Sequence, residues 1–185
     1  LVASRSARAL GRLNQSLKLL DDSRDEESEI ARTERAVVQL EIGRPDRAAE
    51  ILRRQFDAQP GAAALGASLA EALQASGRAE DALEVLMQIA IRRPDLPTYA
   101  LEAARLARHL ERTEEALSLV NEARQRLWMD PEMLGAVADL YEQLDEVELA
   151  AQTWERALHL RPGDTLFRAG WERLQPPRDA ALPFE

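Results

Sequence analysis

Apolar side chains recur at helical spacing in blocks about as long as an α-helix, and a short polar break ends each block. Leucine returns every fourth position at Leu65, Leu69 and Leu73. The run Ser76-Gly77-Arg78 ends that stripe, and a second apolar stripe follows from Ala82 to Ile89. Spacing by three and four residues places apolar side chains on one helical face, so the pattern predicts two amphipathic helices joined by a tight turn.

This outline repeats every 34 residues. One series of alanines marks the second stripe of each unit, and a larger apolar residue follows each of them four positions later. The alanines are Ala48, Ala82, Ala116 and Ala150, and the followers are Leu52, Leu86, Val120 and Trp154. A second series marks the first stripe at Ala36, Ala70, Ala104 and Ala138. A fixed period of this length predicts an array of helical hairpins, in this chain four units near residues 29–62, 63–96, 97–130 and 131–164.

The recurring alanines have a packing explanation. Where the two helices of a hairpin cross and meet the next unit, a side chain larger than methyl would push the helix axes apart. Overpacking of this kind costs about 1–3 kcal/mol. We therefore expect these alanines to be buried and to serve the fold, not a binding site.

The breaks between paired helices differ among the units. Gly43 and Gly77 occupy equivalent turns, where glycine readily takes the left-handed conformation that ends a helix. Glu111 and Asp145 stand at the same place in the third and fourth units. We expect those two turns to be less sharply closed.

With the segments on either side of the hairpins, the sequence divides into four predicted regions. Residues 1–22 read as an N-terminal amphipathic helix and as half of a truncated repeat. Residues 23–164 hold the four units, opened by a capping-box pattern from Ser23 to Glu26. Residues 165–175 read as a capping helix that shields the last apolar face. Pro176 and Pro177 stop it, and residues 176–185 are expected to be extended.

Composition narrows the classes of partner. The formal net charge is −9, from 33 acidic and 24 basic residues, which disfavours nonspecific binding to nucleic acid and to anionic membranes. No apolar run approaches the length that crosses a bilayer, so we expect a soluble segment without direct membrane insertion. Lys18 is the only lysine, a bias that suggests a GC-rich bacterial genome. The compartment, bacterial cytoplasm or periplasm, stays open.

Candidate catalytic and metal sites are weak in this sequence. Cysteine is absent, and the two histidines, His109 and His159, lie in different units without a metal-binding spacing. No nucleotide fingerprint or nucleophile elbow occurs. We therefore expect no enzymatic activity, no metal and no cofactor.

The alanine series and the closing prolines Pro60, Pro94 and Pro162 resemble those of tetratricopeptide repeat proteins. Trp128 stands in the proline's place in the third unit, where we expect it to be buried between units, the alternative being a partly exposed anchor. The resemblance implies an all-α, right-handed α-solenoid of about four helical hairpins. It also implies a concave groove, lined by the first helix of each hairpin, that recognises proteins.

Groove positions of the family carry over residue by residue. They place a mixed set of charged, polar and apolar side chains in the predicted groove: Glu71, Gln74, Leu101, Arg105, Arg108, His109, Asp139, Glu142 and Gln143. Arg105, Arg108 and His109 fall on about one helical turn and could hold an acidic partner segment, unless nearby glutamates such as Glu102 and Glu111 pair with them.

These observations favour a noncatalytic scaffold that holds a partner peptide or helix in the groove. Two alternatives stay open. The segment is the recruiting arm of a larger bacterial envelope, secretion or polysaccharide-export protein, or it is an assembly element that forms homo-oligomers.

Overall fold

The computed structural model describes residues 2–9, 11–21 and 28–175, and within these residues all regular structure is helical. The chain divides into two compact units, residues 1–95 and 96–185. The first contains α1 (Val2–Ala9), α2 (Leu13–Asp21), α3 (Glu29–Glu41), α4 (Pro45–Ala58), α5 (Ala63–Ala75) and α6 (Ala79–Arg92). The second contains α7 (Thr98–His109), α8 (Thr113–Arg126), α9 (Pro131–Gln143), α10 (Val147–Leu160) and α11 (Thr165–Arg173).

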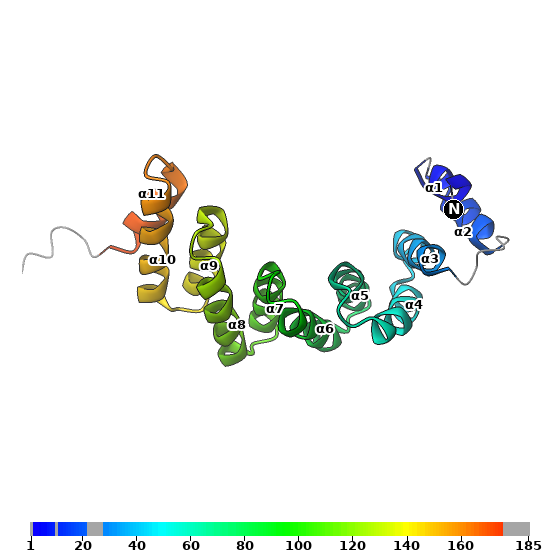
Figure 1. Cartoon of the computed structure of the whole chain (residues 1–185), viewed down its shortest axis with the longest axis horizontal. Coiled ribbons are helices and arrows are strands. Elements are labelled where there is room, and N and C mark those ends of the chain that lie inside the picture. Colours follow the sequence, from blue (N-terminus) through cyan, green and yellow to red (C-terminus); the bar gives the residue numbers. More distant parts are fainter. Residues whose placement is uncertain (1, 10, 22–27, 176–185) are drawn as a thin grey trace, which may run out of the picture. The chain divides into compact units, whose positions relative to one another are not determined.

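Inside each unit every helix packs on the next one along the chain (Figure 1). The pairs α3 and α4, α5 and α6, α7 and α8, and α9 and α10 coincide with the four intervals in which the sequence pattern places hairpins. The chain therefore has an all-α helical repeat fold, as expected.

The positions that recur every 34 residues lie in the core. All eight alanines of the two series are at most 1% exposed. Leu52, Leu86, Val120 and Trp154 are buried beside them. Small side chains at the crossings and larger ones a turn later let neighbouring helices approach closely, which is the packing predicted from the spacing.

The four hairpin turns close in the same way, including the two without glycine. Gly43 and Gly77 have φ of 81° and 77°, and Glu111 and Asp145 have φ of 60° and 61°. In each turn the next residue's amide donates to the carbonyl five positions earlier, at 2.8–2.9 Å. The expectation of looser turns at Glu111 and Asp145 was wrong, because the same hydrogen bonds hold both residues in the left-handed conformation.

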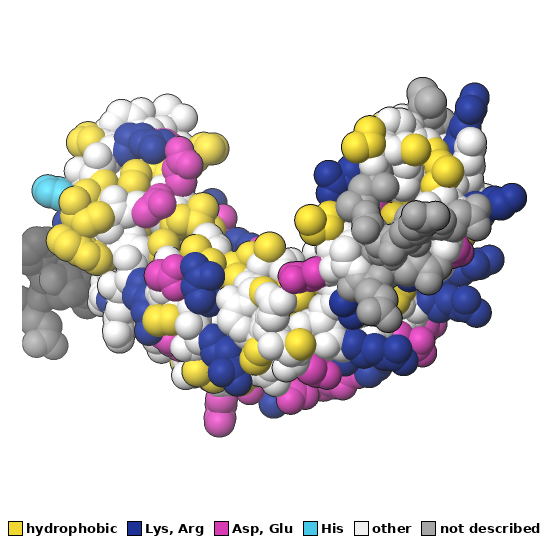
Figure 2. Space-filling model, turned by 45° about the vertical axis from the view of Figure 1, so that its right-hand side comes forward, with side chains coloured by type: hydrophobic (Ala, Val, Ile, Leu, Met, Phe, Trp, Pro, Cys, Tyr) yellow, Lys and Arg dark blue, Asp and Glu magenta, His cyan; other side chains and the backbone are white. Residues whose placement is uncertain are grey.

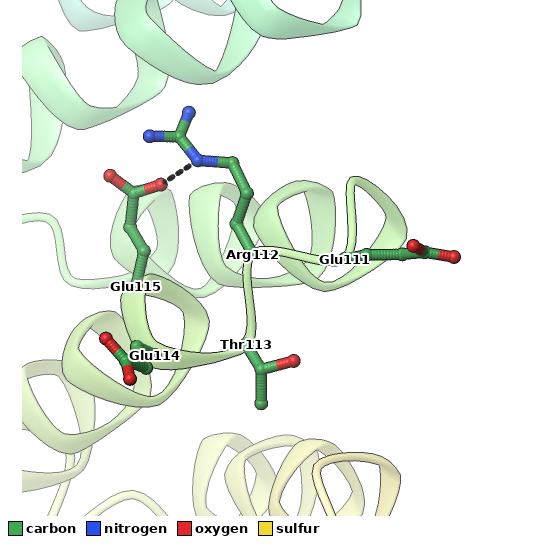
Figure 3. Close-up of a pocket in the computed structure, with 5 residues that line it drawn as sticks. All are labelled: Glu111, Arg112, Thr113, Glu114 and Glu115. Atoms are coloured by element: carbon green, nitrogen blue, oxygen red, sulfur yellow. Dashed lines mark ion pairs between the residues drawn. The ribbon is translucent and has the colours of Figure 1, made fainter.

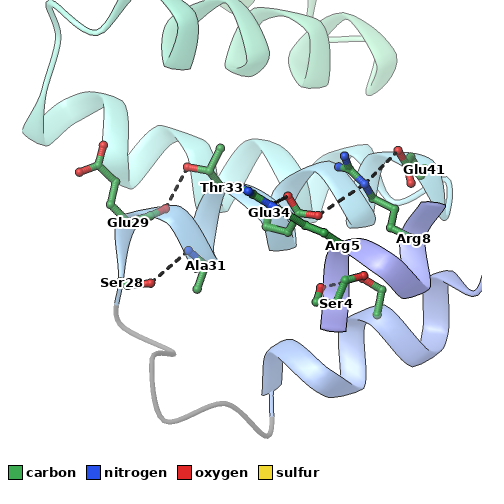
Figure 4. Close-up of polar contacts among 10 residues, drawn as sticks. Ser4, Arg5, Arg8, Ser28, Glu29, Ala31, Thr33, Glu34 and Glu41 are labelled. Carbon is green, nitrogen blue, oxygen red and sulfur yellow. Dashed lines mark hydrogen bonds and ion pairs between the residues drawn. The ribbon is translucent and has the colours of Figure 1, made fainter. Parts of the chain in front are cut away.

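The N-terminal segment contains two helices in place of the single helix expected over residues 1–22. Gly11, at φ of 70°, ends α1 and turns the chain into α2. The buried hydroxyls of Ser4 and Ser16 lie 2.8 Å apart and join the two helices. The carboxylate of Glu34 on α3, also buried, pairs with Arg5 and Arg8 of α1, each at 3.4 Å (Figure 4).

Helix α3 begins after Ser28, whose hydroxyl accepts a hydrogen bond from the amide of Ala31 at 3.2 Å (Figure 4). The capping box expected at Ser23 to Glu26 lies outside the described residues, as does the tail expected at 176–185.

Helix α11 covers the apolar end of the second unit. Asp164 caps its first turn by accepting from the amides of Leu166 and Phe167. Phe167 packs on Trp154 with ring centroids 6.0 Å apart. Trp171 packs against the same cluster, so Trp154 and Trp171 both serve the core. None of the described helices has the length and apolar character that spanning a membrane requires.

Candidate protein-binding face

Two charged side chains mark the outward surface of the first helices in the second unit. Arg105 projects from α7 and Asp139 from α9, and both are exposed. Their charges interact, because Arg105 is among the groups that lower the pKa of the Asp139 carboxyl. We call the exposed surface around Arg105, Arg108, His109, Asp139 and Gln143 the α7–α9 face.

The carboxyl groups of Asp139 and Glu102 are partly buried, which disfavours their charged form. Partial burial raises the pKa of Asp139, and the neighbouring Glu142 raises it further, while Arg173 and Arg105 act in the opposite direction. Partial burial also raises the pKa of Glu102, against the effect of Arg105. Both carboxylates would therefore gain from an additional hydrogen-bond donor or cation.

The three cationic or titratable groups at the end of α7 lie close together but differ in exposure. Arg105 and His109 are exposed, whereas Arg108 is half-buried and its Nε is buried without a hydrogen-bond partner in the described part of the chain. In residues 28–175, neither Arg105 nor Arg108 forms an ion pair with Glu102 or Glu111. Partial burial raises the pKa of Glu102, but Arg105 acts to lower it, so these two charges interact without a direct pair.

Two predicted groove residues have other roles. Leu101 is only 2% exposed and belongs to the core. Glu142 accepts a hydrogen bond from Trp154 Nε1 at 2.7 Å and from Arg173 Nη2 at 2.7 Å. Because these partners lie on α10 and α11, Glu142 ties three helices together.

The residues predicted from the first unit lie on α5. Glu71 and Gln74 are exposed there. With Gln143, which is exposed at the end of α9, they are polar positions available to a partner.

Arg173 is a charged group of this region that the sequence pattern did not single out. It comes from the capping helix α11 and acts on Asp139 as well as on Glu142. The sequence indicated that one side of the capping helix is charged, but it did not indicate that Arg173 on that side lies next to Asp139 and Glu142 of α9.

Acidic and basic side chains both occur in several places on the visible surface and adjoin in some of them, as Figure 2 shows. The net charge of −9 is therefore not gathered into one acidic field on this side of the molecule.

A hollow of about 440 Å³ lies at the turn between α7 and α8. Glu111, Arg112, Thr113, Glu114 and Glu115 line it (Figure 3). Arg112 Nε pairs with Glu115 at 2.8 Å, and Glu111 points away from that pair. The carboxylates diverge, so they do not form the paired acid and base that general catalysis uses. Among the described residues, no cluster of three or more metal-ligating side chains occurs.

Trp128 was expected to be buried between the third and fourth repeats, and this was wrong. It is 56% exposed, as is Met129 beside it. The side chain lies on the surface because Leu127 takes the buried position in this turn.

A family model for the tetratricopeptide repeat matches residues 39–106. No curated protein matches the sequence significantly. Among solved structures, a thermophilic tetratricopeptide protein of Thermus thermophilus is 24% identical with a TM-score of 0.55, over 94% of this chain and 96% of that one.

Two further structures have the same fold. The C-terminal part of a tetratricopeptide protein from Cytophaga hutchinsonii is 14% identical with a TM-score of 0.72, over 93% of this chain and 69% of that one. YrrB, described as having an unusual peptide-binding site, is 14% identical with a TM-score of 0.63, over 91% and 88%. At these identities the likeness shows the fold alone.

Proposed function

We propose that this chain, which matches a tetratricopeptide repeat model over residues 39–106 and shares the fold of tetratricopeptide proteins, is a noncatalytic protein-interaction scaffold that holds an acidic segment of a partner protein on the α7–α9 face. A peptide-binding site is named for YrrB, a protein of the same fold.

The observation that carries the proposal is the state of Arg105. Its side chain is exposed, and within the described residues it forms no hydrogen bond or ion pair, while it interacts electrostatically with Glu102 and Asp139. A guanidinium in this state can form a bidentate pair with an incoming carboxylate at little cost. Arg108 and His109, within one turn of the same helix, add donors beside it.

The same face also carries acceptors. Asp139 and Gln143 on α9 can accept hydrogen bonds from backbone or amide groups of the partner. Cations on α7 and acceptors on α9 would fix the direction and register of a bound segment, because reversal would oppose like charges. Rigid helices preform the surface, so ordering costs fall mainly on the ligand.

The test is affinity capture with variants that reverse charge on this face. Arg105→Glu with His109→Glu is the preferred pair, since both side chains are exposed and Arg108 is half-buried. Arg92→Glu with Arg168→Glu is the matched control, because these residues are exposed and belong to other helices, α6 and α11. Thermal unfolding establishes that all variants are folded.

We expect proteins retained by the wild type and the control to be lost by the Arg105 and His109 double variant. Equal retention by all three proteins would exclude this face as the binding surface.

A further inference from the structure

A second hollow, of about 420 Å³, lies on the other helices of the second unit. It is lined by Arg124 and Gln125 of α8, by Trp128 just after that helix, and by Gln152, Thr153 and Arg156 of α10. Leu134 of α9, which is buried, contributes to its lining. Its volume falls in the lower part of the range of ligand pockets, about 300–1,000 Å³.

The apolar part of this hollow is not explained by the fold. Trp128, which lines the hollow, and Met129, which follows it in the chain, are each 56% exposed. The equivalent pairs in the other 34-residue repeats are Pro60-Gly61, Pro94-Asp95 and Pro162-Gly163. Since those turns form without a large side chain, neither the turn nor the core requires an aromatic residue at this point. An exposed tryptophan beside a hollow is typical of a binding hot spot.

The polar part of the hollow is cationic. The guanidinium of Arg156 lies 5.3 Å from the centroid of the Trp128 ring, and its Nε donates to the Trp128 carbonyl at 3.3 Å. Arg124 lies over the ring of Tyr141 at 5.9 Å. These contacts fix both arginines on aromatic neighbours, and within the described residues neither has a carboxylate at ion-pair distance.

Two carboxylates on the neighbouring parts of α8 and α9 pair with other arginines. Glu122 pairs with Arg126, and Glu132 pairs with Arg161 at 3.2 Å. No carboxylate lines the hollow, although the chain as a whole carries a net charge of −9. This is therefore a local cationic site with an aromatic wall, and a ligand that matches it carries negative charge next to an apolar side chain.

We propose that this hollow binds an acidic peptide segment of a partner protein, with one aromatic or large aliphatic side chain placed against Trp128 and flanking carboxylates on Arg124 and Arg156. The site is separate from the α7–α9 face, because it shares no residue with that face and its polar side chains come from α8 and α10. If this second proposal fails, the proposed function on the α7–α9 face is unaffected. If the proposed function fails, this second proposal is likewise unaffected.

The experiment uses a short synthetic peptide with a central Phe-Leu pair flanked by glutamates, labelled for fluorescence anisotropy. An analogue with glutamine in place of every glutamate tests the charge requirement, and oligothymidylate tests a nucleic-acid ligand. The protein variants are Trp128→Ala, Arg156→Glu and the charge-matched control Arg168→Glu, an exposed position on α11.

We expect the wild type to bind the acidic peptide and both hollow variants to lose about tenfold in affinity. Arg168→Glu should stay within about twofold, as expected for diffuse surface charge. Trp128→Phe should recover part of the loss, which separates recognition by an aromatic ring from damage to the fold. The glutamine analogue should bind weakly to every protein.

Four outcomes would overturn the proposal: no binding of the acidic peptide by the wild type, equal affinity for the hollow variants, an equal loss in Arg168→Glu, or tighter binding of oligothymidylate than of the peptide. Sedimentation over a concentration series tests for a fifth outcome that would overturn the proposal. Self-association that Trp128→Ala abolishes would assign the hollow to a second copy of this chain instead.

Discussion

At the scale of the residue, Glu111 and Asp145 are the clearest points of stored strain. Both hold φ near +60° to close a turn that glycine closes in the first two hairpins. A side chain in this region costs about 1 kcal/mol or more, which the surrounding hydrogen bonds must offset.

Glu111→Gly should therefore stabilise the protein by about 0.5–1 kcal/mol, after allowing for glycine's greater freedom in the unfolded chain. Gly77→Ala should have the opposite sign, because it places a methyl group in the same conformation. Denaturant unfolding measures both changes. Destabilisation by Glu111→Gly would contradict the account of this turn.

Glycine has a different role at Gly170, where it permits close approach between helices. A Cβ placed there would lie 2.6 Å from the ring of Trp154, whereas one at Gly163 would meet nothing within 4 Å. Gly170→Ala should destabilise the protein by about 1–3 kcal/mol through overpacking. Gly163→Ala is the matched control and should have little effect. Similar stabilities for the two variants in thermal unfolding would show that α11 does not pack closely on Trp154.

The raised pKa of Asp139 gives a prediction about pH. Its ordinary value is 3.8, and partial burial raises it in the folded protein, so between these two values the folded state binds more protons than the unfolded state. Stability contributed by this group therefore falls as pH rises through that window. Asp139→Asn should raise the free energy of unfolding at neutral pH and leave it unchanged below pH 3.8. A lower stability of the variant at neutral pH would show that the arginines outweigh burial.

Two residues show the limit of sequence reasoning at this scale. The 34-residue period placed every recurring alanine in the core correctly. Leu101, expected in the groove from the family resemblance, is buried, and Trp128, expected to be buried, is exposed, because burial depends on which helix lies opposite. The roles of Arg173 and Trp154 as partners of Glu142 are contacts across helices and leave no mark in the spacing.

At the scale of the element, Glu142 connects the capping helix to the last hairpin. It accepts from the indole of Trp154 on α10 and from Arg173 on α11. Removing it leaves the indole N–H of a buried tryptophan without its acceptor.

Glu142→Ala should accordingly cost about 1–3 kcal/mol, and amides of α11 should exchange faster with solvent than those of α7. The exposed neighbour Gln143→Ala is the control and should change neither quantity. Unchanged exchange in α11 after Glu142→Ala would mean that apolar packing alone holds the capping helix.

The N-terminal elements show why helix ends are harder to predict than helix faces. The apolar stripe there suggested one continuous helix, but Gly11 interrupts it and the buried pair Ser4 and Ser16 joins the two pieces. Serines in a buried contact carry no apolar signal. The segment also depends on Glu34, a charged residue that the pattern alone would have assigned to the surface.

At the scale of the whole molecule, the fold repeats the same contacts between small side chains from one hairpin to the next. Each hairpin buries its apolar surface against the helices next to it in the chain. Among the described residues, the titratable groups are not gathered in one enclosed site. The outward faces of the helices are left to differ from repeat to repeat, and they carry the cationic and aromatic groups that we assign to partners.

The most direct test of the central claim places a photo-crosslinking amino acid at single positions of the intact chain. Positions 105 and 143 lie on the α7–α9 face, and Ser118 on α8 is an exposed control in the same unit. We predict that positions 105 and 143 crosslink to the same captured partner and that position 118 does not. Crosslinking from position 118 alone, or from none of the three, would contradict the claim that this protein holds another chain on its first helices.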